Sequence, residues 1–137
     1  MSYWPSAERR PSVSSCVLDA SAVLALLHKE PGADTVAEKL PNAAISTVNL
    51  AEVVTKLMDA GMPLEEARNV VDMLGLKYLP FETNTAFQVA GLRKQTRALG
   101  LSLGDRACLA TGAEQGVPVV TAERRWGKLT TDVELIR

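Results

Sequence analysis

Four acidic residues of this 137-residue sequence stand where a predicted strand passes into a helix or where a helix begins: Asp19, Glu52, Asp105 and Glu123. The strands of a parallel sheet end along one edge, so acids placed there on different strands are expected to converge. Carboxylates that are held together repel one another and need a cation. Oxygen ligands with no His or Cys nearby suit Mg²⁺ or Mn²⁺. Such an ion binds a phosphodiester oxygen and lowers the pKa of a bound water, which predicts metal-assisted phosphoryl hydrolysis.

Short hydroxyl and basic side chains accompany these acids. Ser21 and Thr121 can order a metal-bound water or a phosphate, and an equally good interpretation is that they simply cap helices. Basic residues close to the acids can grip an RNA or DNA backbone on either side of a scissile phosphate, or form a solvated charged face. These basic residues are Arg106, Arg124, Arg125 and Lys128.

Each acid also has a purely structural interpretation. Asn49 with Glu52, and Ser102 with Asp105, have the spacing of a capping box, in which an acid at the third helical position closes the helix N-terminus. Asp19 can be an N-cap residue. Capping explains any single acid well, whereas the occurrence of several acids at one predicted sheet edge favours a shared cation.

The elements that must position these residues alternate along the chain. Predicted strands cover residues 16–18, 42–46, 77–81, 117–121 and 133–136, the last at a sheet edge. Predicted helices cover residues 20–29, 33–40, 47–60, 64–74 and 85–99. Residues 101–105 lead into a further helix that ends near residue 115, and residues 122–126 are expected to form a single helical turn. This alternation predicts an α/β fold with a central parallel sheet of four to five strands and helices on both faces.

Length and composition favour one domain over residues 15–137, preceded by a flexible tail at residues 1–14 that contains Arg9 and Arg10. Aromatic residues make up only 4% of the chain, so base stacking is not the expected way of holding a nucleic acid. No apolar run reaches the ~18 residues of a membrane span, and the N-terminus lacks the apolar core of a signal peptide. We therefore expect a soluble, cytoplasmic protein.

The net charge of −1 argues against a nucleic-acid binder only if the acids are evenly spread. Setting the four acids aside leaves 16 − 4 = 12 acids against 15 Lys and Arg residues, a formal surplus of +3. Cys16 and Cys108 lie in apolar runs and are expected to be free and buried, which suits a reducing compartment. His28 is the only histidine, so a two-histidine nuclease and a His-rich zinc site are both excluded.

Four motifs carry a resemblance to a known family. In order, they are V-L-D-A-S-A-V-L-A-L-L, N-L-A-E-V, L-S-L-G-D-R-A-C-L-A and V-V-T-A-E-R-R-W. With this order and spacing, the chain from Val17 to Ile136 resembles the PIN-domain ribonucleases, above all the toxin of bacterial VapBC-type toxin–antitoxin pairs. The resemblance implies a PIN fold, a Mg²⁺- or Mn²⁺-dependent endoribonuclease, a homodimer, and inhibition by a small antitoxin.

The resemblance also implies roles for particular residues. Asp19, Glu52 and Asp105 match the metal-binding acids of the family. Glu123 stands where the family more often has Asp, and its extra methylene group can move it from direct coordination to a role through water. The helix 20–27 and the helical hairpin 47–74 offer a groove for an antitoxin helix, although core packing explains the same residues.

Two alternatives come from other classes of protein. A non-catalytic PIN-like module would bind RNA or a protein partner without metal-dependent cleavage. A phosphoacceptor receiver domain also carries acids on this edge, but it needs adjacent acids after the first strand, whereas Asp19 is followed by Ala20 and Ser21.

Overall fold

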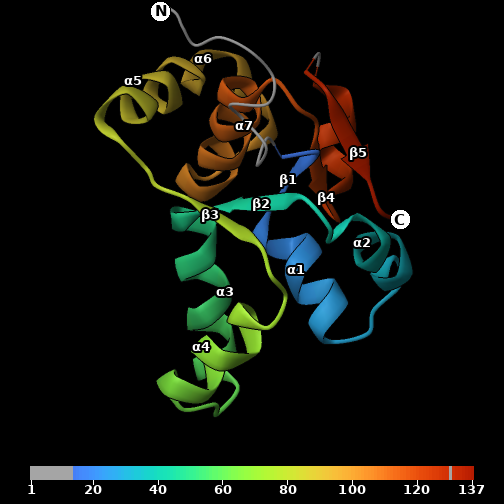
Figure 1. The fold of residues 1–137 in the computed structure, drawn as a ribbon. Helices are drawn as coiled ribbons and strands as arrows, with labels where there is room; N and C mark the ends of the chain where they lie inside the picture. The colour runs from blue at the N-terminus through green and yellow to red at the C-terminus, as the bar shows by residue number, and fades with distance from the viewer. Residues whose placement is uncertain (1–13, 130) are drawn as a thin grey trace, which may run out of the picture.

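The computed structural model describes residues 14–129 and 131–137, and its centre is a five-stranded parallel sheet (Figure 1). The strand order is β3-β2-β1-β4-β5, and every neighbouring pair is parallel. The strands are β1 (Cys16–Leu18), β2 (Ala43–Ser46), β3 (Lys77–Leu79), β4 (Val119–Thr121) and β5 (Val133–Leu135). The predicted parallel α/β sheet is thus confirmed, with the expected edge strand at the C-terminal end.

Helices connect the strands and cover the sheet. The α-helices are α1 (Ala20–Leu27), α2 (Ala33–Lys39), α3 (Thr47–Asp59), α4 (Leu64–Asp72), α5 (Thr83–Gly91), α6 (Arg93–Thr96) and α7 (Leu103–Gln115), and the short 3₁₀ helices are η2 (Arg97–Leu99) and η3 (Arg124–Lys128). Figure 1 shows α1 to α4 on one side of the sheet, and α5, α6 and α7 on the other.

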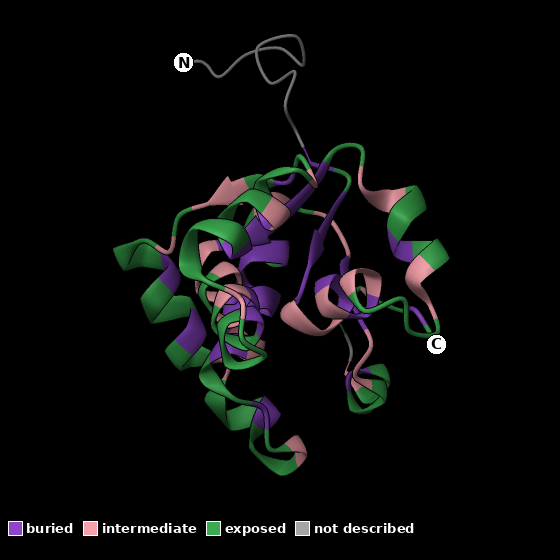
Figure 2. Cartoon of the chain, turned by 90° about the horizontal axis from the view of Figure 1, so that it is seen from below, coloured by how far each residue is buried: buried purple, intermediate pink, exposed green. Residues whose placement is uncertain are grey.

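Alternating side chains of the strands build a core on each face of the sheet. Cys16 and Leu18 of β1 pack into a cluster with residues of α1 to α4, while Val17 between them packs into a second cluster with Cys108 of α7 and Trp126 of η3. Both faces of β1 are therefore buried, as its uninterrupted apolar run predicts. In Figure 2 the central strands are buried along their length and most exposed residues lie on the outer helices.

The single helix predicted at residues 85–99 is wrong. The chain instead forms α5, a break at Leu92, the one-turn α6 and the 3₁₀ turn η2. Gly91 weakens the helix at this point, and the buried Thr96 hydroxyl donates to the Leu92 carbonyl oxygen at 2.7 Å, which competes with regular helical bonding. The break allows Leu92 and Leu99 to pack against the core cluster that contains Trp126.

The order of the strands brings two strand ends together. After β1 the chain adds β2 and β3 on one side, and then returns to place β4 on the other side of β1. At such a reversal the crevice beyond the carboxyl ends of the strands is where open α/β sheets bind ligands. Asp19 after β1 and Thr121 at the end of β4 lie at this crevice.

Other expectations from the sequence have separate outcomes. Both cysteines, Cys16 and Cys108, are free and buried, as predicted. His28 is the C-cap residue of α1, and its half-exposed ring lies 3.8 Å from the Glu30 carboxylate. Residues 1–13 of the expected tail, including Arg9 and Arg10, lie outside the described residues, whereas Ser14 is buried. Within the described ranges, no helix is both long enough and apolar enough to span a membrane.

Candidate active site

Asp19 is a buried carboxylate at the junction of β1 and α1, with only 3% of its surface exposed. It is the N-cap residue of α1, and its Oδ1 accepts a hydrogen bond from the Ala22 backbone N–H at 2.8 Å. The Ser21 hydroxyl donates to the same carboxylate at 2.8 and 2.9 Å, and the Thr121 hydroxyl donates to Oδ2 at 2.6 Å. The predicted N-cap role is thus confirmed, and it accounts for only one of the groups that hold the side chain.

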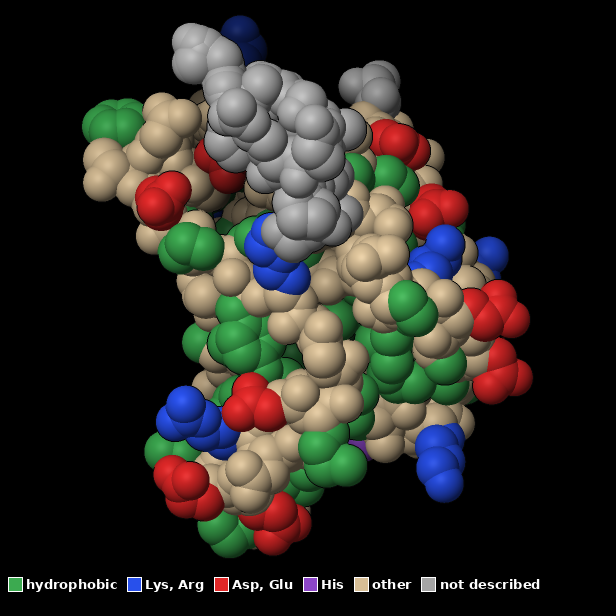
Figure 3. Space-filling view, in the orientation of Figure 1, with side chains coloured by type: hydrophobic (Ala, Val, Ile, Leu, Met, Phe, Trp, Pro, Cys, Tyr) green, Lys and Arg blue, Asp and Glu red, His purple; other side chains and the backbone are tan. Residues whose placement is uncertain are grey.

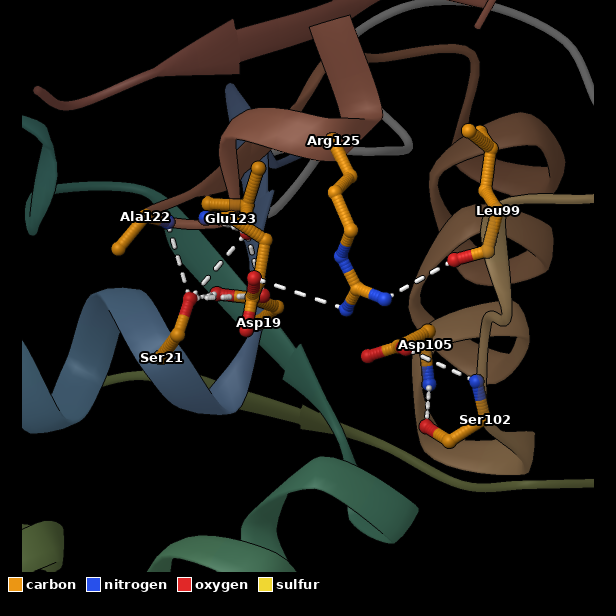
Figure 4. Close-up of polar contacts among 9 residues, drawn as sticks. Asp19, Ser21, Leu99, Ser102, Asp105, Ala122, Glu123 and Arg125 are labelled. Carbon is orange, nitrogen blue, oxygen red and sulfur yellow. Dashed lines mark hydrogen bonds and ion pairs between the residues drawn. The ribbon is translucent and has the colours of Figure 1, made fainter. Parts of the chain in front are cut away.

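Ser21 and Thr121 tie the carboxylate to the chain that follows β4. Ser21 Oγ accepts from the Ala122 backbone N–H and Thr121 Oγ1 accepts from the Glu123 backbone N–H, each at 2.9 Å (Figure 4). The two hydroxyl oxygens are 3.2 Å apart. Both hydroxyls therefore fix the position of Asp19 across the β1–β4 pair.

The charge on Asp19 is unfavourable where it lies. Burial raises the pKa of its carboxyl group from an ordinary 3.8 to about 6, although hydrogen bonds from Thr121, Ala22 and Ser21 favour the ionised form. The nearby negative charge of Asp105 raises the pKa further. A cation beside Asp19 would relieve both effects, which makes this carboxylate a good partner for a metal ion.

Glu52 reaches the site from α3 and lies against the first turn of α7. The N-cap residue of α3 is Ser46, whose hydroxyl accepts from the Val48 N–H, so the predicted capping box of Asn49 and Glu52 is wrong. Asn49 instead donates from Nδ2 to Glu52 Oε1 at 2.8 Å. A Cβ atom on Gly104 would lie only 2.3 Å from Glu52 Oε2, so the close approach of the carboxylate requires glycine there.

Asp105 is held by the capping box that the sequence predicts. Its backbone N–H donates to Ser102 Oγ at 3.1 Å, and its Oδ2 accepts from the Ser102 backbone N–H at 2.9 Å. No hydrogen bond to its other carboxylate oxygen, Oδ1, comes from the described residues. The cap therefore fixes the orientation of the side chain and leaves one oxygen for a ligand.

Glu123 has a partly exposed side chain that is paired with Arg125. Its carboxylate lies 3.6 Å from Arg125 Nη2, and Arg125 Nη1 donates to the Leu99 carbonyl oxygen at 2.9 Å. In Figure 4 Arg125 extends between a group containing Asp19 and Glu123 and a group containing Asp105. Arg125 is thus the basic residue that the structure brings closest to the predicted acids.

The other predicted basic residues are placed differently. Arg106 Nη1 donates to the Val89 carbonyl oxygen of α5 at 3.1 Å, which engages it in packing between α5 and α7. Arg124 is exposed and makes no hydrogen bond or ion pair with the described residues. Lys128 lines a separate cavity of about 860 Å³ beside α5, α6 and α7, and none of the four acids lines it.

Three of the acids lie within electrostatic range of one buried group. The pKa of the Cys108 thiol is raised well above its ordinary value by burial, and then by the negative charges of Asp19, Asp105 and Glu52. Across residues 14–129 and 131–137, however, no three His, Cys, Asp or Glu side chains are placed ready to hold one metal ion. The donor chemistry of Asp19, Asp105 and Glu52 fits Mg²⁺ or Mn²⁺, since carboxylate oxygens are the hard ligands that these ions prefer.

Sequence reasoning missed the roles of Asn49 and Gly104. The sequence pattern suggests only a capping role for Asn49 and no role for Gly104. The available signal was a polar amide among apolar helical residues, three positions before Glu52, but its second partner lies 55 positions along the chain.

Comparisons with known proteins agree with this architecture. No curated protein sequence matches the chain. Among solved structures, a chain of a toxin–antitoxin complex from Klebsiella pneumoniae gives a TM-score of 0.74 at 18% identity, with 90% of this chain and 98% of that chain covered. A chain of DNA-bound VapBC from Salmonella typhimurium gives 0.71 at 17% identity, covering 90% and 99%. FitAcB from Neisseria gonorrhoeae gives 0.64 at 21% identity, covering 88% and 97%.

At these identities the structural likeness demonstrates a shared fold. The family assignment comes from the sequence: the model of the PIN domain matches residues 16–131, which is most of the chain. The protein therefore belongs to the PIN domain family.

Proposed function

We propose that this protein is a metal-dependent endoribonuclease and the toxin of a type II toxin–antitoxin pair. The observation that carries the proposal is the buried Asp19 carboxylate, held at the β1–β4 junction with its pKa raised to about 6 by burial and, to a smaller extent, by the negative charge of Asp105. Asp19, Asp105 and Glu52 also act together on one buried group, the Cys108 thiol. Perturbed carboxylates at the end of a parallel sheet are typical of catalytic sites.

Asp19, Asp105 and Glu52 would hold the metal ion, and Glu123 would support a second or transient one. A bound Mg²⁺ or Mn²⁺ supplies Lewis-acid activation of water and stabilises negative charge on the scissile phosphate. Ser21 and Thr121 keep Asp19 ionised and oriented, while Ser102 orients Asp105. Attack by water predicts products without a 2′,3′-cyclic phosphate.

The toxin role is supported by the structural neighbours, several of which are toxin–antitoxin complexes. Exposed apolar side chains on the hairpin of α3 and α4 also favour a protein partner there, since Met58, Leu64 and Met73 are 43%, 54% and 85% exposed. We propose a small antitoxin as this partner, and a homodimer of the toxin. Co-expression with the product of a neighbouring small open reading frame should give a complex that survives gel filtration.

The nuclease assignment is tested by removing one acid at a time. Purified protein without antitoxin is incubated with structured RNA and Mn²⁺ or Mg²⁺, beside the variants Asp19→Asn and Asp105→Asn. We expect each variant to lose about 100-fold in cleavage rate, in the range for removing one electrostatic group from a transition state. Asp59→Asn, at the exposed end of α3, is the matched control and should cleave like the wild type.

Equal cleavage by the wild type and by both site variants would remove these acids from the mechanism. Cleavage that persists in excess EDTA would rule out a divalent ion instead. Either result would overturn the proposal.

Arg125 gives a separate prediction about RNA binding. Figure 3 shows one face of the molecule, on which acidic and basic side chains are interspersed rather than gathered into a basic patch. Arg125 is held between the Glu123 carboxylate and the Leu99 carbonyl oxygen, so it is placed to contact a phosphate that binds beside these acids. We expect Arg125→Ala to weaken RNA binding about tenfold, as for the loss of one charge-assisted hydrogen bond.

The control for this prediction is Arg124→Ala, which removes the same charge one residue away. Binding is measured by fluorescence anisotropy in Ca²⁺ or EDTA at fixed salt, so that the RNA remains intact. Equal effects of the two substitutions would show that only net charge matters.

A second candidate function is a non-catalytic PIN-like module that binds RNA or a protein. It is favoured by the observation that, in the described part of the chain, no three acids are already placed around one ion. This alternative predicts that the protein binds RNA without a dependence on divalent ions and does not cleave the RNA.

A further inference from the structure

The buried amide of Asn49 is an unusual choice for the core of α3. Only 1% of its surface is exposed, and the apolar Val53 and Leu57 bury the same face of the helix. A buried amide costs free energy of folding unless its polar atoms find partners. The position therefore calls for a reason other than packing.

The Nδ2 group of Asn49 has two partners on two different helices. It donates to Glu52 Oε1 at 2.8 Å, one turn further along α3, and to the Gly104 carbonyl oxygen of α7 at 3.0 Å. Both partners are acceptors, so the flipped amide would turn its own oxygen toward two oxygens. The bonding pattern thus fixes the orientation of the amide.

The absence of a side chain at Gly104 is a second observation that places the Glu52 carboxylate against the first turn of α7. A Cβ atom at this position would lie 2.3 to 2.7 Å from the three carboxylate atoms of Glu52. Gly104 does not have a positive φ, so close approach and not backbone conformation is what glycine provides here. The residue after Gly104 is Asp105, so the contact also sets the place of Glu52 relative to that second acid.

The remaining amide atom argues against a purely structural role. Asn49 Oδ1 is buried and has no hydrogen-bond partner among the described residues. Leucine has a similar size and would fill the site without an unsatisfied acceptor. The benefit of asparagine at this position must therefore come from its two donated hydrogen bonds.

We propose that Asn49 is a positioning residue that holds the Glu52 carboxylate over Gly104, in place for a divalent cation. This inference rests on the proposed function, because it assigns Glu52 to a metal site. Replacing a residue that orients a metal ligand by a hydrogen bond, without binding the metal itself, commonly lowers metal affinity by about 10- to 100-fold.

The test measures Mn²⁺ binding by titration calorimetry without RNA, together with the melting temperature in EDTA. We expect Asn49→Leu to bind Mn²⁺ about tenfold more weakly and to melt at or above the wild-type temperature. A merely structural role predicts the opposite pattern, a lower melting temperature with unchanged affinity. Asn69→Leu, on the exposed side of α4, is the matched control and should leave Mn²⁺ binding unchanged.

Two further variants make the result decisive. Gly104→Ala keeps the amide but pushes the flexible end of Glu52 away, so it should also weaken Mn²⁺ binding about tenfold, and it tests the inference even if Asn49→Leu does not fold. If Asn49 acts through Glu52, then Asn49→Leu should have no further effect on Mn²⁺ affinity in a Glu52→Gln background.

The possible outcomes separate this inference from the proposed function. If Glu52→Gln weakens Mn²⁺ binding while Asn49→Leu and Gly104→Ala bind like the wild type, the role of Asn49 is overturned and the metal site stands. If Glu52→Gln and Asp19→Asn also bind like the wild type, the metal site itself is wrong and the role of Asn49 falls with it.

Discussion

The metal-free Asp19→Asn variant is expected to gain about 3 kcal/mol of stability relative to the wild type between pH 4 and pH 7.5. Burial raises the pKa of Asp19 to about 6 in the folded protein, against 3.8 in the unfolded chain. Between these values the folded state binds more protons, so the stability of the wild type falls as the pH rises through this window. Each unit of pKa difference is worth about 1.4 kcal/mol, and the full loss is reached above pH 6.

Urea unfolding in EDTA at pH 4, 5, 6 and 7.5 measures this effect. The variant cannot ionise at position 19, so its stability should rise relative to that of the wild type as the pH rises above 4. Asp59→Asn, an exposed acid on α3, should show no such difference. A variant that is less stable than the wild type at pH 7.5 would show that the lost hydrogen bonds outweigh the cost of burying the charge.

Divalent ions should more than offset the gain of the variant at pH 7.5. A ligand that binds only the folded state stabilises it by about 4.1 kcal/mol at 1,000 times its dissociation constant, more than the ~3 kcal/mol cost of the buried charge. Mn²⁺ should therefore raise the stability of the wild type at pH 7.5 and leave Asp19→Asn nearly unchanged. The Asp19 carboxylate thus lowers the stability of the metal-free protein and is needed to bind the metal ion, a trade-off that is expected of a functional residue.

The fold was predictable because its signals are local. The apolar run of β1, the Gly116 helix end and the Ser102–Asp105 capping box can each be recognised within a few residues. The break between α5 and α6 was not predictable, because a glycine such as Gly91 weakens a helix but does not necessarily end it. Packing of Leu92 and Leu99 against the distant core decides the outcome there.

The contact across the ends of β1 and β4 was predictable, whereas the contacts that join α3 to α7 were not. Alignment of strand ends predicts that Asp19 and Thr121 approach each other, and their side chains are indeed 2.6 Å apart. The contact of Asn49 with Gly104 crosses 55 residues of sequence, so the polar residue at position 49 is noticeable in the sequence but its partner on α7 is not. Arg106 likewise follows an acid in sequence but bonds to the Val89 carbonyl oxygen, because the helical turn at this point faces α5.

The second large effect is expected at Trp126, the largest fully buried side chain of the described residues. It fills the core cluster formed by Val17, Leu101 and Cys108, on the face of the sheet covered by α7. Trp126→Ala should destabilise the protein by about 3 to 5 kcal/mol, the usual cost of emptying such a site. Circular dichroism during urea unfolding measures this loss without relying on tryptophan fluorescence.

A conservative variant separates packing from the polar atom of the ring. Trp126 Nε1 is buried and has no hydrogen-bond partner among the described residues. Trp126→Phe loses volume but also removes this unpaired donor, so its cost should be clearly smaller, about 1 to 2 kcal/mol. Phe87→Ala, at a side chain that is 73% exposed, should change stability by less than about 0.5 kcal/mol.

The Trp126→Ala substitution should also disturb the candidate active site, because Trp126 anchors the turn that follows Glu123 and contains Arg125. Without the indole, this turn loses its main contact with the core, and Arg125 loses its fixed place between Glu123 and the Leu99 carbonyl. Trp126→Ala should therefore weaken RNA binding by up to as much as Arg125→Ala, even at temperatures where the variant remains folded. Wild-type RNA binding in a folded Trp126→Ala variant would show that the position of Arg125 does not depend on the core beneath it.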